Sequence, residues 1–305
     1  MSSSAGQKRK AKSKSKSKAK KEARRLEKIR EAERRDTIRQ ANWVDGDDTT
    51  PRNVLDTTGF LQGSPFRNYT KNNLSVHIGY ASSSDLSDAD LAVLYELTQT
   101  NMLEHYNHAA EVDPTDWSWN EKKKMEELRH PEARYLIARA APSSLVSGTS
   151  KGDIVGFAHI RFELEGIYEV TYIYELQIAQ MAQKHGLGKR IMQLIELVSV
   201  KLAMKWVMLT VFKGNDAAGN FYTKLKYELD EIDPSLCEEN ATDEPKPYSI
   251  LSKCVDREEK KRLAAIKFLN NAVAEDERQE QAARAQKIML ATPTKGKSTQ
   301  KKSSP

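Results

Sequence analysis

Residues 174–198 read YELQIAQMAQKHGLGKRIMQLIELV, an alternating stretch that passes through a glycine-containing turn into an amphipathic stretch. The first part has the period of a strand, and the second places Ile191 and Ile195 on one face of a helix. Gly186 and Gly188 lie between the two parts and allow backbone conformations that other residues resist. A helix N-terminus offers free N–H groups and a positive dipole end, so this turn suits a diphosphate.

The turn does not match the common phosphate-binding motifs. It lacks the GxxxxGK[ST] of a Walker A loop and the third glycine of a dinucleotide fingerprint. Lys184, Lys189 and Arg190 add positive charge around it. A tight connection between a strand and a helix, with no ligand, is the alternative interpretation.

Hydrophobic periodicity predicts further strands and helices on both sides of this stretch. The predicted strands are residues 76–80, 134–140, 153–164, 168–179, 206–212 and 248–255. The predicted helices are residues 87–106, 114–128, 188–205 and 215–227. This order predicts an α/β (α+β) fold, a mixed and mostly antiparallel sheet flanked by helices, with one βαβ crossover and an N-terminal helical extension.

Charge divides the chain of 305 residues into an acidic body between basic tails. Residues 1–40 carry a net +11, residues 41–255 a net −10, and residues 256–305 a net +5. The predicted organisation is a disordered basic tail (1–21), a helical segment (22–44), one folded domain (45–255), and a charged helical segment that ends in a disordered basic tail (256–305).

Composition argues against several protein classes. The sequence has no run of eighteen apolar residues and no apolar N-terminal region, so neither a membrane span nor a secretory signal is expected. Cys237 and Cys254 are too few for a disulfide framework or a zinc site. His105, His108 and His185 lack ligand partners at metal spacing, so no metal is expected.

The pattern Q-x-x-G-x-G from Gln183 to Gly188, after a long strand and opening a helix, resembles the acetyl-CoA turn of the GNAT acetyltransferase superfamily. In that superfamily the next strand leads to an Asn and then to a helix that carries a Tyr. Here residues 206–212 lead to Asn215, and Tyr222 follows. The resemblance implies acetyl-CoA as co-substrate and no metal.

Residues 70–255 also resemble the N-alpha-acetyltransferase D family (NatD), through the segments LTQTNMLEHY, DWSWN, YIYELQI, GLGK, KWVMLTVFKGN and YSILSK. That family acetylates the N-terminal α-amine of histone 4 and histone 2A, which begin Ser-Gly-Arg-Gly. The net charge of −10 on the body is consistent with such a cationic substrate. The resemblance implies a direct transfer from acetyl-CoA to the amine in a ternary complex.

Glu175, Tyr174 and Tyr222 are the catalytic residues that the resemblance implies. Glu175 is the candidate general base, acting directly or through one water, because an α-amine has a pKa near 7.7–8.0. Strict alternation puts Glu175 on the opposite face to Tyr172 and Tyr174. The family fold implies a bulge here, which would re-aim Glu175. Tyr222 is a candidate acid for the leaving thiolate.

The resemblance also implies two binding sets. The cofactor-binding residues are Leu176, Gln177, Ile178, Gln183, Lys184, His185, Gly186, Leu187, Gly188, Lys189 and Asn215. The substrate-binding residues are Tyr106, Trp117, Glu163, Tyr172, Tyr174, Thr210 and Tyr248. Glu163 stands where the family has Asp. The segment between Tyr106 and Trp117 is longer than the family pattern, so either Trp117 or Trp119 is the pocket tryptophan.

Two other functions remain open from the sequence. One is acetylation of lysine or a small amine on the same fold, since fold does not fix function. The other is a protein that binds chromatin or ribosomes through its basic tails. These tails suit chromatin, a ribosome or an import receptor, with a solubilising role as the plain alternative. We expect a monomer that occupies the nucleus and the cytoplasm.

Overall fold

The computed structural model describes residues 3–42, 65–113, 117–144, 146, 148, 150–236 and 246–291. It divides into two units, Met1–Asp256 and Arg257–Pro305. The second unit contains one long helix, α8 (Arg257–Ala291), and each unit is described by itself. No helix in the described part of the chain is long and apolar enough to cross a membrane.

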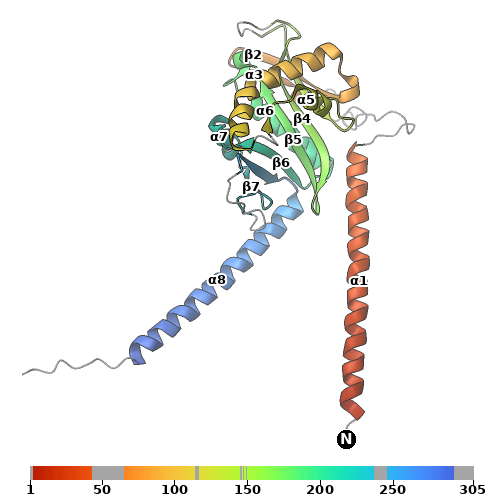
Figure 1. The fold of residues 1–305 in the computed structure, drawn as a ribbon, viewed down its shortest axis with the longest axis vertical. Coiled ribbons are helices and arrows are strands. Elements are labelled where there is room, and N and C mark those ends of the chain that lie inside the picture. Colours follow the sequence, from red (N-terminus) through yellow and green to blue (C-terminus); the bar gives the residue numbers. More distant parts are fainter. Residues whose placement is uncertain are drawn as a thin grey trace, which may run out of the picture. The chain divides into compact units, whose positions relative to one another are not determined.

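The first unit is built on one mixed sheet of eight strands (Figure 1). The strands are β1 (Asn68–Lys71), β2 (Leu74–Ser82), β3 (Arg134–Ala140), β4 (Ile154–Glu165), β5 (Tyr168–Ile178), β6 (Trp206–Phe212), β7 (Glu228–Leu229) and β8 (Tyr248–Cys254). Their order across the sheet is β1-β2-β3-β4-β5-β6-β8-β7. Within the described residues β5 and β6 are the one parallel pair of neighbours, and a helix connects them. The predicted fold class is therefore confirmed.

Helices cover both faces of this sheet. They are α1 (Ser3–Asn42), α3 (Asp88–Val112), α5 (Glu121–Leu128), α6 (Leu187–Lys201) and α7 (Asp216–Lys224). In three of them, α3, α5 and α7, the side chain of the N-cap residue accepts a hydrogen bond from a backbone N–H of the first turn. Ser87 accepts from the Asp90 N–H at the start of α3, and Asn120 caps α5.

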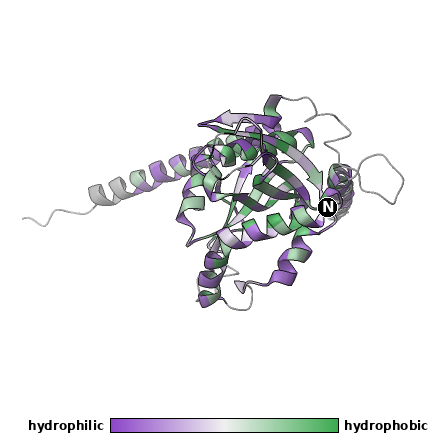
Figure 2. Ribbon diagram, turned by 90° about the horizontal axis from the view of Figure 1, so that it is seen from above, coloured by the Kyte–Doolittle hydropathy of each residue, from purple (hydrophilic) through white to green (hydrophobic). Residues whose placement is uncertain are grey.

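The apolar residues form two clusters, one on each face of the sheet. Leu91 and Leu94 of α3 and Leu128 of α5 pack on Tyr135 and Phe157 of the sheet. The larger cluster includes the apolar face of α6, whose predicted inward residues are buried, together with the opposite face of the central strands. Figure 2 shows the same division, with the hydrophobic colour concentrated in the sheet and on the inner sides of its helices.

The N-terminal segment differs from its prediction. The sequence predicts disorder over 1–21 and a helix over 22–44, whereas one helix, α1, runs from Ser3 to Asn42. Lys and Ala are good helix formers, which lets a helix continue through the Lys-rich stretch. The C-terminal end of α1 is attached to the body, because Ala41 is buried and Asn42 Nδ2 donates to the Phe162 carbonyl at 2.9 Å.

The sheet also has an edge strand that lies outside the predicted strands. Residues 43–64 lie outside the described residues, but β1 follows at Asn68–Lys71 and pairs with β2. Asn72 and Asn73 join the two strands, and both have positive φ (51° and 67°). Asparagine tolerates this conformation, which two-residue hairpin turns require. The sequence stretch therefore forms a hairpin at the edge of the sheet.

The feature of the fold that positions the site is the opening between β5 and β6. Their parallel pairing covers only residues 170–173 of β5 and 206–209 of β6. Beyond it β5 continues to Ile178 along β4, and β6 continues to Phe212 along β8. The two strands thus separate, and the edges that face each other past residue 173 carry backbone groups outside this ladder.

Candidate active site

A β-bulge in β5 lies where the two strands begin to separate. His159 of β4 pairs with Glu175, and the next residue, Ile160, pairs with Ile173, so Tyr174 is the extra residue. A bulge places two successive side chains on one side of the strand. Glu175 consequently shares a face with Tyr174, as the family fold implied and strict alternation did not.

Glu175 is buried, with 5% of its surface exposed, and both of its carboxylate oxygens are held. Oε1 accepts from Lys124 Nζ of α5 at 2.8 Å. Oε2 accepts from Gln177 Nε2 at 2.7 Å. Gln177 Oε1 in turn accepts from Asn101 Nδ2 of α3 at 3.0 Å. The candidate base is therefore fixed by α3, α5 and its own strand.

Lys124 lies at the centre of a buried cluster of charges. Its ammonium also donates to Glu127 Oε1 at 3.2 Å and to the Tyr106 hydroxyl at 3.1 Å. Burial lowers the pKa of Lys124, but Glu175, Tyr106 and Glu127 together outweigh it, and the pKa is raised overall. Burial raises the pKa of Glu127, although Lys124 opposes this. The cluster thus holds one ammonium between two carboxylates.

An aromatic cluster lies beside these charges. Trp117 packs against Phe212 of β6 and Tyr248 of β8, with ring centroids 4.9 and 5.0 Å apart. Tyr106 of α3 contacts both Trp117 and Phe212. Trp119 instead packs on Tyr106 and Tyr95, both of α3. Of the two tryptophans, Trp117 is thus the one that contacts both Tyr106 and Tyr248, two of the predicted substrate residues.

The remaining predicted substrate residues form hydrogen-bonded pairs on β4, β5 and β6. The Tyr172 hydroxyl and Thr210 Oγ1 lie 2.6 Å apart. The Tyr174 hydroxyl donates to Glu163 Oε1 at 2.9 Å, and the Arg161 guanidinium lies 4.0 Å from the centre of the Tyr174 ring. Burial raises the pKa of Glu163, with Tyr174 and Arg161 opposing it. Glu163 therefore provides an acidic, partly buried acceptor near the aromatic rings.

The glycine turn has the shape of an anion cradle at the start of α6. Gly186 has φ +84°, and a Cβ there would lie 2.6 Å from the Tyr69 hydroxyl. That hydroxyl donates to the His185 carbonyl at 2.7 Å, and His185 Nδ1 lies 2.8 Å from the Asn72 carbonyl. The β1–β2 hairpin thus fixes the turn, and His185 is engaged with the hairpin. These residues fit a diphosphate, which the first N–H groups of α6 would bind.

Other predicted cofactor residues lie around the same opening. Gln183 Nε2 donates to the Ile178 carbonyl at 3.1 Å, which ties the turn to the end of β5. Leu187 is buried, and Gly188 faces Phe221 of α7, with an added Cβ meeting it at 3.4 Å. Lys184 and Lys189 of the turn are exposed.

Asn215 and Tyr222 both belong to α7 and have clear structural roles. Asn215 caps the helix, because its Oδ1 accepts from the Ala218 N–H at 3.0 Å. Tyr222 is buried between Phe221 and Tyr227. Burial, together with Glu175, raises the pKa of Tyr222, which makes its hydroxyl a weaker acid than an exposed tyrosine.

Sequence reasoning missed several residues that hold this site. Lys124, Glu127, Asn101, Arg161 and His159 were not identified as site residues. One signal was available for Lys124, because it stands four residues before Leu128 on the inward face of α5, and both side chains are buried. A lysine on the inward face of a helix is expected only where a partner is present. Its partner, Glu175, lies 51 residues away in the sequence.

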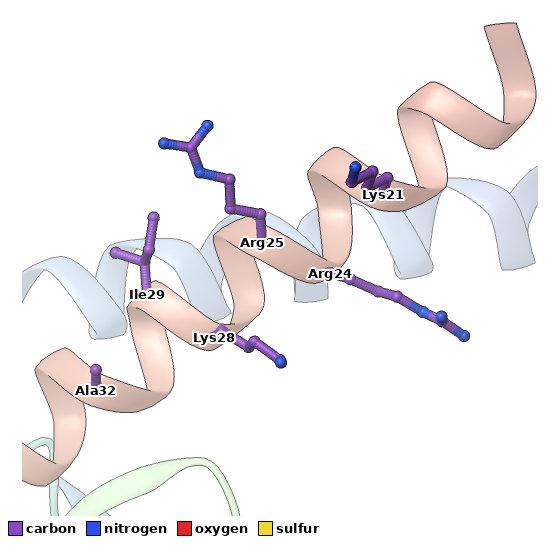
Figure 3. A pocket seen from close by; sticks show the side chains of 6 residues that line it. All are labelled: Lys21, Arg24, Arg25, Lys28, Ile29 and Ala32. Carbon is purple, nitrogen blue, oxygen red and sulfur yellow. The ribbon is translucent and has the colours of Figure 1, made fainter.

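A surface hollow on α1 is unrelated to these residues. Figure 3 shows its lining, which consists of exposed side chains of one helix: Lys21, Arg24, Arg25, Lys28, Ile29 and Ala32. The basic side chains extend outward from the helix and do not converge on a common point. Within the described residues, no group of three His, Cys, Asp or Glu side chains is placed to bind a metal ion.

Comparisons with known proteins agree with this geometry. Residues 95–227 match the model of the acetyltransferase (GNAT) family. The D-amino-acid N-acetyltransferase HPA3 of Saccharomyces cerevisiae is 28% identical over 91 residues, which is 29% of this chain and 56% of that protein. The chain therefore spans about half the length of this curated relative.

Two solved structures are also similar. The ribosomal-protein-S18-alanine N-acetyltransferase of Escherichia coli has 17% identity and a TM-score of 0.36, over 59% of this chain and 94% of that chain. A GNAT-family acetyltransferase of Listeria monocytogenes has 10% identity and a TM-score of 0.41, over 61% and 99%. Residues 95–227 thus match the GNAT acetyltransferase family model, and they contain β3 to β6 of the mixed sheet.

Proposed function

We propose that this protein is an N-terminal α-amino acetyltransferase that uses acetyl-CoA and acts on histone 4 and histone 2A, whose chains begin Ser-Gly-Arg-Gly. The observation that carries the proposal is the position of Glu175. This buried carboxylate lies on the bulge where β5 leaves β6, next to the Tyr106–Trp117–Tyr248 aromatic cluster. The match to the GNAT family supports acetyl transfer, and the resemblance to NatD supports the acceptor.

The proposed reaction assigns a binding or catalytic role to each of the following groups. Acetyl-CoA supplies the activated acetyl thioester. The N–H groups at the start of α6 would bind its diphosphate, and the edge of β5 past its pairing with β6, at 176–178, would pair with its amide arm. Glu175 accepts the proton that the attacking amine loses. Tyr222 is the proposed donor of the proton that the leaving thiolate takes up.

The proposed preference for a cationic peptide rests on the acidic side chains and the aromatic rings of the site. Glu163 and Tyr174 form a hydrogen-bonded acidic pair suited to a peptide that carries an amine and an arginine. Trp117 Nε1 is buried and, among the described residues, has no hydrogen-bond partner. A peptide carbonyl is a suitable acceptor for that N–H. The body, with net charge −10 over residues 41–255, favours encounter with a cationic chain.

We propose further that the protein is a monomer of the nucleus and the cytoplasm, and that its basic tails contact chromatin, ribosomes or an import receptor. Residues 1–40 carry a net +11, and such segments bind polyanions or import receptors. These contacts would add to acetyl transfer without taking part in its chemistry.

The experiment that tests the proposal measures acetyl transfer from acetyl-CoA to three short peptides. One begins with a free Ser-Gly-Arg-Gly, the second is the same peptide with a blocked α-amine and internal lysines, and the third has an unrelated free N-terminus. We expect transfer to the first peptide alone. Transfer to the blocked peptide would make the protein a lysine acetyltransferase, and no transfer to any peptide would contradict the proposal.

A further inference from the structure

We infer that Lys124 of α5 is a positioning residue, which fixes the ionised carboxylate of Glu175 for proton abstraction, and that Glu127 weakens this hold by sharing the same ammonium. This inference rests on the proposed function, because it assigns Lys124 a role toward the proposed base. It predicts that charge on α5 sets the lowest pH at which the enzyme turns over.

The Lys124 ammonium is surrounded by hydrogen-bond acceptors. An ammonium has three N–H donors, and Lys124 Nζ has three partners within hydrogen-bond distance. These three side chains are Glu175 (Oε1 at 2.8 Å), Tyr106 (Oη at 3.1 Å) and Glu127 (Oε1 at 3.2 Å and Oε2 at 3.3 Å), so Glu127 offers both oxygens to one donor. The side chains of Lys124 and Glu175 are 7% and 5% exposed. Their attraction is therefore weakly screened by solvent.

The Glu175 carboxylate has little freedom to move away from Lys124. Its other oxygen accepts from Gln177 Nε2, and Gln177 is held by Asn101. Removing the ammonium would therefore leave the carboxylate in the same buried position without its nearest positive charge. A buried carboxylate without a cation favours its protonated form.

The charged and titratable groups around Glu175 come from several elements. They are Lys124 and Glu127 on α5, Tyr106 on α3, Tyr135 on β3, His159 and Arg161 on β4, and Tyr222 on α7. Burial lowers the pKa of His159, which leaves that ring neutral. Among the described residues, Lys124 is the cation that donates directly to Glu175.

Two substitutions on α5 should therefore act in opposite directions. Lys124→Met removes the cation, so the acid limb of kcat against pH should move upward by about one pH unit or more. Glu127→Gln removes the second carboxylate and leaves the ammonium to Glu175, so the limb should move downward. Lys124→Arg keeps the charge and should restore the wild-type limb to within a few tenths of a unit.

The experiment measures kcat and KM for the Ser-Gly-Arg-Gly peptide and acetyl-CoA from pH 5 to 9, on the full chain. Lys123→Met and Glu126→Gln are matched controls, because they make the same changes at side chains of α5 that lie outside the cluster. We expect opposite shifts for the Lys124 and Glu127 variants, no shift for the controls, and nearly unchanged KM for acetyl-CoA. A loss of kcat by the same factor at every pH would overturn the inference.

A second measurement separates this inference from the proposed function. Urea unfolding of Glu175→Gln, Lys124→Met and the double variant at pH 7.5 gives the coupling between the two side chains without any assay of turnover. We expect the double variant to be less destabilised than the sum of the single variants. Additive effects would overturn the pairing itself. A coupling observed in a wild-type chain that transfers no acetyl group would leave the pairing standing, and would overturn the proposed function together with the catalytic role of Lys124.

Discussion

Replacing Glu175 with Gln keeps the shape of the side chain and removes its capacity to accept a proton. General base catalysis is typically worth 10²–10⁴-fold, so we expect kcat of Glu175→Gln to fall by about that factor. Binding of acetyl-CoA, measured by calorimetry, should be unchanged, because the glycine turn and the edge of β5 are untouched. Turnover near the wild-type rate would remove Glu175 from the role of base.

His159 carries a prediction about stability, because it is fully buried and stacked between Tyr135 and Tyr174. Burial holds the pKa of His159 well below 6.5 in the folded protein. The unfolded chain therefore binds a proton below pH 6.5 that the folded chain does not, and stability falls as pH drops through that value. The slope for this one group is about 1.4 kcal/mol per pH unit.

The measurement is urea unfolding of the wild type and His159→Phe at pH 5.5 and 7.5. Phenylalanine keeps the ring stack and cannot titrate. We expect the wild type to lose about 1 kcal/mol more than the variant between these two pH values, since other groups titrate alike in both. An equal loss in both proteins would show that His159 accepts its proton in the fold.

At the scale of the elements, the contact between the β1–β2 hairpin and the glycine turn can be tested directly. Gly186→Ala imposes an unfavourable positive φ and drives Cβ against the Tyr69 hydroxyl. We expect a loss of roughly 1–2 kcal/mol from the backbone alone, and weaker binding of acetyl-CoA. The double variant Gly186→Ala/Tyr69→Phe should regain part of both losses, because the hydroxyl is gone.

Unfolding free energies and acetyl-CoA affinities of the two single variants and the double variant check this. Tyr69→Phe alone is the control for losing the hydrogen bond from Tyr69 to the His185 carbonyl. If the double variant is worse than the sum of the two, the hairpin does not limit the space at Gly186.

The regular elements could be read from the sequence because their signals are local. The alternating strands and the apolar face of α6 appear at nearly the predicted positions. The hairpin of β1 was missed because its turn residues, Asn72 and Asn73, lack the glycine that makes Asn-Gly a strong hairpin signal. Its strand of four residues also has little alternation to detect.

The candidate site was partly predictable for a different reason. Glu175 and the glycine turn lie in one continuous stretch, so their motif is visible in the sequence. Lys124 approaches Glu175 only through the packing of α5 on the sheet. The spacing of Lys124 to Leu128 marks this lysine as inward-facing, but it does not identify Glu175 as the partner. Non-local charge pairing therefore needed the fold.

At the scale of the whole molecule, charge is separated along the chain. Residues 1–21 hold nine basic and no acidic residues, and α1 is attached to the body near its C-terminal end. Deleting residues 1–21 should leave turnover on a short peptide unchanged. It should weaken binding to a nucleic acid duplex and reduce the dependence of that binding on salt concentration.

Deleting residues 1–42 should have a different result, because it removes the docked end of α1. Arg134 is 1% exposed and donates to the Asn42 carbonyl at 2.8 Å. Loss of that acceptor leaves part of a buried guanidinium unpaired, which costs roughly 1.5–3 kcal/mol. Ala41 would also lose its place in the core. We therefore expect the unfolding midpoint to fall by several degrees, as measured by calorimetry, with the deletion of 1–21 as the matched control. Equal midpoints for the two deletions would mean that the end of α1 does not stabilise the body.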